Sequence, residues 1–391
     1  MTLIILDASP NIARVAQSLD EPLVFVQSPG SRVFCEPRDA VDTVLVRSWQ
    51  DRAALTALAE ELRPLAPKAV VSVTEHALEP AAVLAELLRL PAVPSQVVAA
   101  TRNKLMTRVI LASKAPHLNV AYADPLNPQA VDELFARGRK VVAKPVDGTG
   151  SREIRLLTRA DDAADPRYRE GYLFEEFAEG KEYSVESFSA AGRHQVIAIA
   201  EKGTTPGFME VLHLMPPVGL PFRHHELIAE SVAELLDALG LTDGPAHTEL
   251  KVEGDTVRII ETHNRPGGGG IAELVHLTTG INWRRVCLGW PLGVRPVAGS
   301  PRSPSAASVL FTALPGTVTD IADRPRLRSD VTLESWRVSV EIGDIVPELR
   351  SARDRVGWAI LAGPTSLACY EAARELLEKP VVMTEGDASP S

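Results

Sequence analysis

Residues 247–270, HTELKVEGDTVRIIETHNRPGGGG, constrain the fold more than any other segment of this chain. Two β-rich runs, HTELKV and VRIIETH, flank the turn cluster EGDT, which predicts a β-hairpin. A three-residue loop at 254–256 would place Glu249 opposite Glu261, with both side chains on one face. A two-residue loop would place Glu249 opposite Ile260 and send the two carboxylates to opposite faces. The register of this hairpin therefore decides whether the carboxylates can act together.

The residues around the hairpin are suited to holding a divalent cation against phosphate oxygens. Glu249 and Glu261 would supply the hard carboxylate ligands that Mg²⁺ prefers. Arg265 would take up negative charge that develops during a reaction, because a guanidinium forms strong hydrogen bonds with anionic oxygens. The glycines at 267–270 would let backbone N–H groups approach an anion closely.

The composition is that of an ordinary globular protein, with 45% hydrophobic and 24% charged residues, and 391 residues allow two or three domains. The formal net charge of −10 and the lack of a basic segment argue against nucleic acid as the main partner. Cys35, Cys287 and Cys369 lie far apart without CxxC spacing, which excludes a zinc cluster and indicates a reducing compartment. No run approaches the roughly 18 apolar residues of a membrane span, and the start MTLIILDASP lacks the positive charge of a signal peptide. We expect a soluble, cytoplasmic protein with no membrane partner.

The pattern of strand-like and helix-like segments divides the chain into three parts, at 1–100, 101–300 and 301–391. The first alternates short β-branched runs such as TLIIL and KAVVSVT with helical patterns such as EPAAVLAELLRL, which predicts an α/β domain on a parallel sheet. The second has hairpins and one long helix, HELIAESVAELLDALG, typical of an α+β domain. A proline-rich stretch at 291–304 separates it from the third, which begins with strands and closes on the helix LACYEAARELLEK. The predicted fold class is therefore α/β and α+β in several domains.

A glycine loop follows a strand in KVVAKPVDGTGS, which places Lys144 at the strand end and Gly148, Gly150 and Ser151 in the turn. Such a loop can fold over phosphates, with its N–H groups facing the oxygens and the lysine adding a point charge. It differs from a Walker A loop, because the lysine precedes the glycines. Taken alone, the segment could equally be a solvated strand end.

A second signal lies in YLFEEFAEGKEYSVESF, where an apolar strand runs into Glu175, Glu176 and Ala178, a glycine turn, and then Glu182 at the head of another strand. A segment that joins two lobes in this way can contact adenine through its backbone and hold ribose hydroxyls with a carboxylate such as Glu182. The alternative is a surface strand pair with solvated glutamates.

The order of these pieces, from Lys104 through the glycine loop and EEFAEGKEYSVE to ETHNRPGG, resembles the ATP-grasp superfamily. The resemblance covers roughly residues 60–300 and is greatest to the amino-acid ligase branch, in which RPGG follows the metal motif. The stretch SVTEHALEPAAVLAELLRLPAVPSQVVAATRNKLMTR is also similar to the one that enters that branch's first phosphate-binding lysine. The resemblance implies an ATP-grasp fold, with an N-terminal Rossmann-like α/β domain and a C-terminal α+β segment that completes the substrate site.

The resemblance also implies roles for single residues. Those that would bind ATP are the phosphate lysines, the loop over the phosphates, the adenine hinge and the ribose carboxylate: Lys104, Lys144, Gly148, Gly150, Ser151, Glu175, Glu176, Ala178 and Glu182. Glu249 and Glu261 match the Mg²⁺ ligands, with Mn²⁺ as an alternative ion. Arg265 matches the arginine that steadies the acyl phosphate and the tetrahedral intermediate, and Gly267 and Gly268 would offer N–H groups at the reacting carboxylate. Arg265, Lys144 and Gly268 would form the catalytic set.

One position departs from the family's usual E-x-N-x-R pattern, because His263 stands at the asparagine position and Asn264 follows it. Period-two alternation places Glu261, His263 and Arg265 on one face and turns Asn264 away. Imidazole suits Mg²⁺ less well than an amide oxygen does. We expect His263 to face the metal site, contacting a phosphate or substrate without being a firm ligand, unless the backbone bends so that Asn264 takes the metal.

Four further residues are candidates for substrate binding. EKGTTPGFMEVLHLMPP is similar to the strand pair lining the branch's amino-acid pocket, which nominates Lys202, Glu210 and His213. Glu210 could hold an ammonium group or lie as an exposed strand carboxylate. Glu75 follows a strand of the N-terminal part, at the edge where open α/β sheets bind ligands, although it could simply cap the next helix.

The resemblance implies an ATP-dependent carboxylate–amine ligase that joins an amino acid or related small acid to a second amine through an acyl phosphate. Phosphoryl transfer would give the carboxylate a good leaving group, and the loop at 148–151 would keep water away from it. An ATP-grasp carboxylase that activates bicarbonate is the alternative among enzymes, and a non-catalytic nucleotide-binding module is the alternative outside them. The expected partners are small acids and amines, and the apolar C-terminal strands point to a homodimer.

Overall fold

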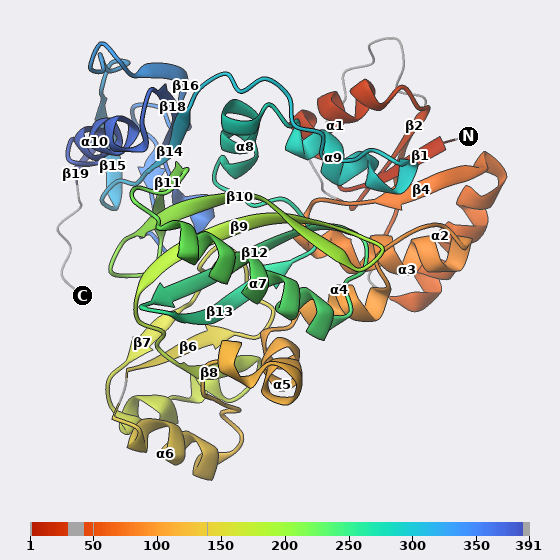
Figure 1. Cartoon of the computed structure of the whole chain (residues 1–391), viewed down its shortest axis with the longest axis horizontal. Helices are drawn as coiled ribbons and strands as arrows, with labels where there is room; N and C mark the ends of the chain where they lie inside the picture. The colour runs from red at the N-terminus through yellow and green to blue at the C-terminus, as the bar shows by residue number, and fades with distance from the viewer. Residues whose placement is uncertain (1, 30–42, 50, 139, 386–391) are drawn as a thin grey trace.

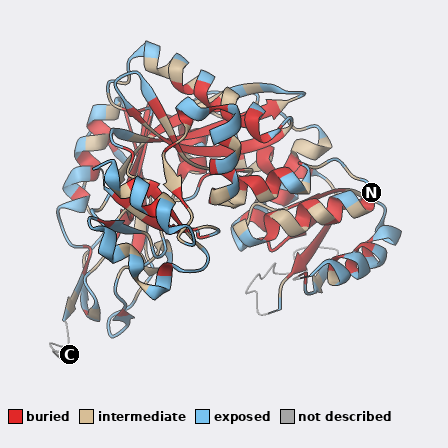
Figure 2. Cartoon of the chain, turned by 90° about the horizontal axis from the view of Figure 1, so that it is seen from below, coloured by how far each residue is buried: buried red, intermediate tan, exposed pale blue. Residues whose placement is uncertain are grey.

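The computed structural model describes residues 2–29, 43–49, 51–138 and 140–385, whose strands form four sheets (Figure 1). A parallel sheet lies at the N-terminal end, an eight-stranded antiparallel sheet runs through the middle, and two small sheets flank the latter. The helices and the sheets enclose several buried apolar layers, which Figure 2 shows as red segments along the strands and on the inner faces of the helices. This mixed architecture confirms the predicted combination of α/β and α+β parts.

The N-terminal sheet has the strand order β3-β2-β1-β4, with every pair parallel. Its strands are β1 (Thr2–Leu6), β2 (Leu23–Gln27), β3 (Thr43–Val46) and β4 (Pro67–Val71). The flanking helices are α1 (Pro10–Ala16), α2 (Arg52–Leu62), α3 (Leu78–Leu88) and, from later in the chain, α9 (Trp283–Gly289). β1 and β2 are buried along their whole length because α2 and α3 pack on one face while α1 and α9 pack on the other. The unbroken apolar runs in these strands predicted this arrangement correctly.

The central sheet has the order β13-β12-β9-β10-β11-β14-β18-β16. Its first five strands are β9 (Lys181–Ala190), β10 (Arg193–Thr204), β11 (Glu210–Met215), β12 (Gly244–Glu253) and β13 (Thr256–His263). The helices α4 (Ser95–Arg102), α5 (Lys104–Lys114) and α7 (Phe222–Leu239) pack their apolar sides on one face. The helices α8 (Ile271–Thr279) and α9 pack on the other face, in a cluster around the fully buried Trp283.

The last part of the chain extends the same central sheet. β14 (Ser305–Phe311), β18 (Gly357–Gly363) and β16 (Thr332–Val338) pair in succession beyond β11, so the sheet crosses the predicted division at residue 300. A three-stranded sheet then forms from other strands of this part, and helix α10 (Ser366–Leu377) packs on the extension. The strands of that sheet are β15 (Gly316–Ile321), β17 (Ile345–Val346) and β19 (Val382–Glu385).

The remaining sheet has the order β5-β8-β6-β7 and forms a lobe with helix α6 (Pro128–Ala136). Its strands are β5 (Tyr122–Ala123), β6 (Val141–Pro145), β7 (Arg155–Leu157) and β8 (Tyr172–Glu176). In Figure 1 this yellow lobe lies below the green central sheet, and β8 leads directly into β9. The chain therefore passes from one sheet to the other at residues 177–180, the segment that the sequence indicated as a hinge.

The hairpin of β12 and β13 reaches the expected pairing by an unexpected route. Glu253 pairs with Thr256, so the loop contains two residues, and Gly254 adopts a φ of +58° there. That register alone would place Glu249 opposite Ile260. A β-bulge between the pairs Glu249–Glu261 and Leu250–Ile259 inserts Ile260 as an extra residue and restores the carboxylate pair. The prediction that the two glutamates face each other is confirmed, whereas the three-residue loop was wrong.

Cys287 and Cys369 are buried free thiols, and the third cysteine of the sequence, Cys35, lies outside the described residues. Within the described ranges, no helix is long and apolar enough to cross a membrane.

Gly180, in the turn between the two sheets, has a φ of +99°, and a Cβ atom there would lie 2.3 Å from the carbonyl oxygen of Val252. Gly192, in the turn between β9 and β10, has a φ of +72° but open space around it. We predict that Gly192→Ala costs about 1 kcal/mol through backbone strain alone. Gly180→Ala should cost roughly 1–3 kcal/mol more, because the methyl group overlaps backbone. Urea unfolding of both variants checks this, and equal losses would contradict the packing at Gly180.

Candidate active site

A cavity lies between the β5–β8 lobe and the central sheet. It is lined by all nine predicted ATP-binding residues and by both predicted metal glutamates. These residues are Lys104, Lys144, Gly148, Gly150, Ser151, Glu175, Glu176, Ala178, Glu182, Glu249 and Glu261. They come from six elements and two loops, and only the closure of one sheet over the other brings them together.

One end of the cavity is apolar and aromatic. Phe177 and Phe208 lie with their ring centroids 6.1 Å apart and their planes tilted by 48°, and the ammonium of Lys251 lies 4.2 Å from the centroid of Phe177. Glu182 heads β9 beside them and accepts from Lys202, which lies 2.8 Å away. A flat ring packed beside these aromatic side chains, with a carboxylate near its polar substituents, is the type of ligand this end can hold.

The opposite end is cationic. Lys104 begins helix α5, which Asn103 caps, and its ammonium donates to the carbonyl of Gly148 at 2.7 Å and contacts Glu261 at 3.1 Å. Lys144 on β6 lies 2.5 Å from a carboxylate oxygen of Glu175. Burial lowers the pKa of Lys144 to about 8, although Glu175 opposes the shift. Two buried ammonium groups beside a glycine loop form a site for phosphate oxygens.

Arg108 holds this end together, and the sequence interpretation missed it. Its guanidinium is almost wholly buried and donates to Glu175 at 2.7 and 3.1 Å. It also donates to the carbonyls of Ile259 and Ile260, at the bulge of β13, at 2.8 and 2.9 Å. Arg108 thus ties the bulge that pairs the two glutamates to the strand that carries Glu175. The only signal in the sequence was that Arg108 lies on the apolar side of the helix predicted by the pattern of α5.

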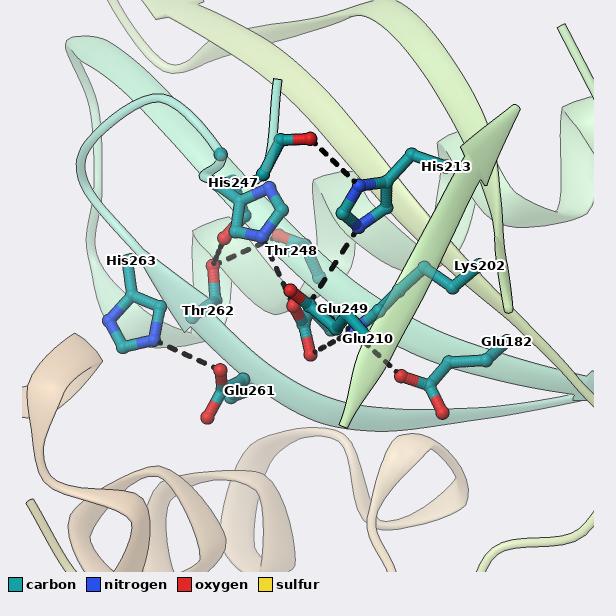
Figure 3. A network of polar contacts seen from close by, with 12 residues as sticks. Glu182, Lys202, Glu210, His213, His247, Thr248, Glu249, Glu261, Thr262 and His263 are labelled. Carbon is teal, nitrogen blue, oxygen red and sulfur yellow. Dashed lines mark hydrogen bonds and ion pairs between the residues drawn. The ribbon is translucent and has the colours of Figure 1, made fainter. Parts of the chain in front are cut away.

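Glu249 and Glu261 are paired across β12 and β13, and Figure 3 shows both side chains. Lys202 lies 2.7 Å from Glu249, while Lys104 contacts Glu261. Burial alone would raise the pKa of each carboxyl group, but Lys202 lowers the pKa of Glu249, and Lys104 and His263 lower that of Glu261 well below its usual value. Both groups are therefore ionised, and each is neutralised by a lysine.

Among the described side chains, no group of three or more His, Cys, Asp and Glu residues comes close enough to bind a metal ion. The structure therefore does not assemble His263 with the two glutamates as a three-ligand centre. Mg²⁺ keeps several waters and is commonly held by one or two carboxylates plus phosphates. The pair formed by Glu249 and Glu261, at the phosphate end of the cavity, fits that mode of binding.

His263 lies on the same side as Glu261, with its Nε2 atom 3.4 Å from that carboxylate (Figure 3) and its Nδ1 atom 3.1 Å from Glu75. Asn264 turns away toward Cys287 and Trp290, and its buried Oδ1 atom has no hydrogen-bond partner among the described residues. The backbone therefore follows simple strand alternation here, and Asn264 does not reach the carboxylate pair.

Glu75 links the N-terminal part of the chain to Arg265 and His263. It accepts a short hydrogen bond from Arg265, contacts His263, and lies 3.4 Å from the guanidinium of Arg102. Burial opposes ionisation, but His263 and Arg265 lower the pKa of Glu75 strongly. The alternative that Glu75 only caps a helix was wrong, because its side chain makes these long-range contacts and Thr74 occupies the cap position.

The prediction that Gly267 offers its N–H group to a reacting carboxylate was wrong. Its N–H group donates to the carboxylate of Glu186 at 3.1 and 3.2 Å, so it does not point at a reacting carboxylate. Glu186 is completely buried and also accepts from Trp283 and contacts His247 at 2.6 Å. The neighbouring Gly268 has open space around it. Glu186 was missed, although it follows Glu182 at strand period and so lies on the same face of β9.

His247 continues this contact to the carboxylate pair. Its Nε2 atom lies 3.3 Å from Glu249 (Figure 3). Burial would lower the pKa of His247, but Glu186 and Glu249 raise it to about 9. A series of polar contacts, from Gly267 to Glu186, then to His247 and then to Glu249, links the glycine run to the carboxylate pair.

A second cavity lies beyond the glycine run, lined by Gly269, Gly270, Arg355 and Trp358 among others. The predicted substrate residues Glu210 and His213 lie between the two cavities: Glu210 contacts Lys202 at 2.9 Å and Arg355 at 3.2 Å, and His213 contacts the carbonyl of Gly269. The alternative of an exposed Glu210 was wrong, since it is held in buried ion pairs.

Two family models match the chain: one for the ATP-grasp domain at residues 138–273 and one for the L-amino acid ligase C-terminal domain 2 at residues 309–383. The chain is similar to the structure of L-amino acid ligase from Bacillus licheniformis, with 22% identity, a TM-score of 0.79, and coverage of 98% of this chain and 99% of that one. It is also similar to N5-carboxyaminoimidazole ribonucleotide synthetase from Thermus thermophilus, with 17% identity, a TM-score of 0.69, and coverage of 97% and 99%. At these identities the two structures establish the fold alone.

Carnosine synthase 1 from Mus musculus is 32% identical over 156 residues, which are 38% of this chain and 19% of that protein. The chain thus spans less than a fifth of the length of the human and mouse carnosine synthases that it matches.

The cavity clamped between two sheets, with lysines and a glycine loop facing paired carboxylates, defines an ATP-grasp protein. The C-terminal match carries the assignment one step further. The chain contains an ATP-grasp domain at residues 138–273, followed at residues 309–383 by a segment that matches the C-terminal domain 2 of L-amino acid ligases, and these matches confirm the resemblance drawn from the sequence.

We predict that Arg108→Met lowers the free energy of unfolding by about 3–5 kcal/mol, because it leaves Glu175 and two carbonyls buried with fewer partners. Arg137→Met, at the exposed end of α6, is the matched control and should stay within about 0.5 kcal/mol of the original protein. Denaturant titration measures both. Equal effects would show that the Arg108 network does not stabilise the fold.

The lowered pKa of Lys144 predicts a pH-dependent affinity for nucleotide phosphates. The free protein loses this ammonium proton above pH 8, whereas a bound anion needs it, so affinity should fall as pH rises through about 8. The limiting slope is about tenfold per pH unit. Calorimetric titration of ADP between pH 7 and 9.5 measures it. Lys144→Arg should flatten the profile, because a guanidinium stays charged, and an unchanged slope in that variant would assign the effect to another group.

Proposed function

We propose that this protein is an ATP-dependent carboxylate–amine ligase that joins an amino acid or related small acid to an amine through an acyl phosphate. The observation that carries the proposal is the cavity in which Lys104 and Lys144 face the carboxylate pair of Glu249 and Glu261, with Arg265 just beyond. The C-terminal match to an L-amino acid ligase domain supports the ligase class. The homodimer and the cytoplasmic location remain predictions.

The nucleotide would lie with its base at the end formed by Phe177 and Phe208 and its ribose near Glu182. Its phosphates would then meet Lys104 and Lys144 under the glycine loop. A Mg²⁺ ion bound to Glu249 and Glu261 would neutralise phosphate charge. Because Lys202 and Lys104 hold these carboxylates, the two ammonium groups would turn to phosphate oxygens as the ligand binds.

In the first step an oxygen of the acid attacks the γ-phosphorus, the bond to the β–γ bridging oxygen breaks, and ADP leaves. In the second step the amine nitrogen attacks the acyl carbon, loses a proton, and expels phosphate. Arg265 is placed to stabilise the charge that develops on the acyl oxygens, since Glu75 fixes its orientation. The glycine loop, which already covers the phosphate end, would keep water from the acyl phosphate.

The carboxylase alternative has weaker support. Biotin carboxylases share the fold, as a TM-score of 0.65 to the Campylobacter jejuni enzyme shows, but at 14% identity this similarity establishes nothing more. The C-terminal match instead favours the ligase. A non-catalytic module is disfavoured because both lysines, both glutamates and the arginine are present and oriented.

The deciding experiment crosses amino acids and small dicarboxylates against amines with Mg²⁺-ATP, and follows ADP, phosphate and product mass. ADP release that requires both an acid and an amine, with a product lighter by one water than their sum, is the expected result. Turnover that needs bicarbonate would support the carboxylase. ATP binding without any ADP release would support the module.

We predict that Glu261→Gln lowers ligation at least about 100-fold, because it removes a charged ligand at the phosphate end while keeping the shape of the side chain. Glu253→Gln, at the exposed end of the same hairpin, is the matched control and should retain activity. Steady-state ADP release at saturating ATP measures both. Activity of Glu261→Gln close to that of the control would refute the role of this carboxylate.

A further inference from the structure

The glycine loop has a strained backbone conformation that contacts from outside the loop must stabilise. Gly150, Ser151 and Glu153 all have positive φ values, +64°, +55° and +60°, and two of these residues have side chains that disfavour the conformation. Each such residue costs on the order of 1 kcal/mol, so the shape persists only where the surroundings enforce it. From within the nucleotide cavity, Lys104 holds the loop at the carbonyl of Gly148.

The second contact comes from the opposite direction, from the C-terminal part of the chain. The N–H group of Ala352 donates to the carbonyl of Gly150 at 3.0 Å. A Cβ atom on Gly150 would lie 3.2 Å from the Cβ of Ala352, so the two backbones approach closely. Only a glycine combines this close approach with the positive φ.

Ala352 is suited to this contact by its place in a short helical turn. It is the first residue of the 3₁₀ turn Ala352–Asp354, where a backbone N–H has no acceptor within the turn. Ser351 caps the turn in a capping box with Asp354, whose carboxylate accepts from Ser351 N–H at 2.7 Å and from Arg350 N–H at 3.0 Å. The unused donor of Ala352 therefore projects from a rigid support.

The support is also fixed to the central sheet. Arg355 donates to the carbonyl of Glu210 at 2.9 Å and to its carboxylate at 3.2 Å, and Val356 donates to the carbonyl of Phe311 on β14. Ala352 and Arg355 line the second cavity, whereas Gly150 lines the nucleotide cavity. The segment 351–355 is thus the wall between the two cavities.

We propose that the turn at 351–355 is a positioning element for the reaction: it latches the glycine loop over the phosphates through the N–H group of Ala352. The inference rests on the proposed function, since it assigns the closed loop the task of shielding an acyl phosphate. When the latch is lost, water reaches the acyl carbon and phosphate leaves, so ATP is spent and the acid is regenerated without ligation. The C-terminal part therefore controls coupling as well as substrate fit.

The test is Ala352→Pro. Proline is accepted at the first position of a helical turn, and Ser351 has the extended backbone, φ −154° and ψ 166°, that a following proline requires. The substitution thus removes the donor while keeping the turn. Ala352→Ser keeps the donor and is the matched control for loop protection.

The direct readout is trypsin cleavage after Arg152, an exposed residue of the loop, with Mg²⁺ and a non-hydrolysable ATP analogue present. Ala352→Pro should be cleaved about fivefold faster than the original protein, as expected for the loss of one hydrogen bond, whereas Ala352→Ser should match the original. This readout does not depend on ligase chemistry. Thermal melting curves first establish that both proteins are folded. Equal cleavage of the proline variant and the original protein would then overturn the latch, even if ligation is confirmed.

Two further measurements separate the latch from a merely structural role and from failure to fold. In the ligation assay, Ala352→Pro should raise the ratio of ADP released to amide formed, and an unchanged ratio would contradict the shielding task. In the original protein, hydrogen exchange resolved to the Ala352 amide should be slow. Exchange at the rate of an open amide would overturn the proposal without any variant.

Discussion

Carboxylates and ammonium groups buried against each other are the interaction on which the site depends. Glu249, Glu261 and Glu175 are each paired with a lysine within 3.1 Å. An isolated charge in such a place would cost several kcal/mol, and removing one partner leaves the other unpaired. The pairing therefore maintains ionised carboxylates and charged lysines in a closed cavity before a ligand is present. A phosphate chain with its cation can exchange with these internal partners without leaving any charge unpaired.

The same network explains why the site needs every part of the chain. Glu75 brings the N-terminal sheet to Arg265, and Arg108 brings α5 to the bulge of β13. Ala352 brings the C-terminal turn to the glycine loop. The central sheet crosses the predicted division at residue 300 and so serves as the common support for all of these contacts. A change in one part is therefore transmitted to the reacting groups through one or two polar contacts.

Strand and helix patterns anticipated the fold well wherever burial is regular. The apolar runs of β1, β2 and β4 predicted a parallel sheet covered on both faces, and the periodic helix at 225–240 forms most of α7. Residues 95–114 form two helices, α4 and α5, because Asn103 ends α4 and caps α5. Local propensity does not show such a break when the flanking residues are all good helix formers.

The polar residues that were missed share one physical property. Arg108 and Glu186 are fully buried charges whose partners are far away in sequence, at Glu175 and the carbonyls of β13 for one and at Gly267, Trp283 and His247 for the other. A pattern of apolar and polar residues assigns charges to the surface. Their role becomes visible only once the hydrogen-bond partners are in place.

The sequence by itself determined the family, the order of the elements and the identity of many residues that line the cavity between the two sheets, because these follow from local patterns and motif order. Tertiary structure alone decided how the residues meet. The register that pairs Glu249 with Glu261 depends on a bulge held by Arg108, and the orientation of His263 and Arg265 depends on Glu75. The glycine loop is hydrogen-bonded by Lys104 at Gly148 and by Ala352 at Gly150. Each of these contacts joins residues that are far apart in the chain, or that lie on two different sheets, and no local preference encodes such a contact.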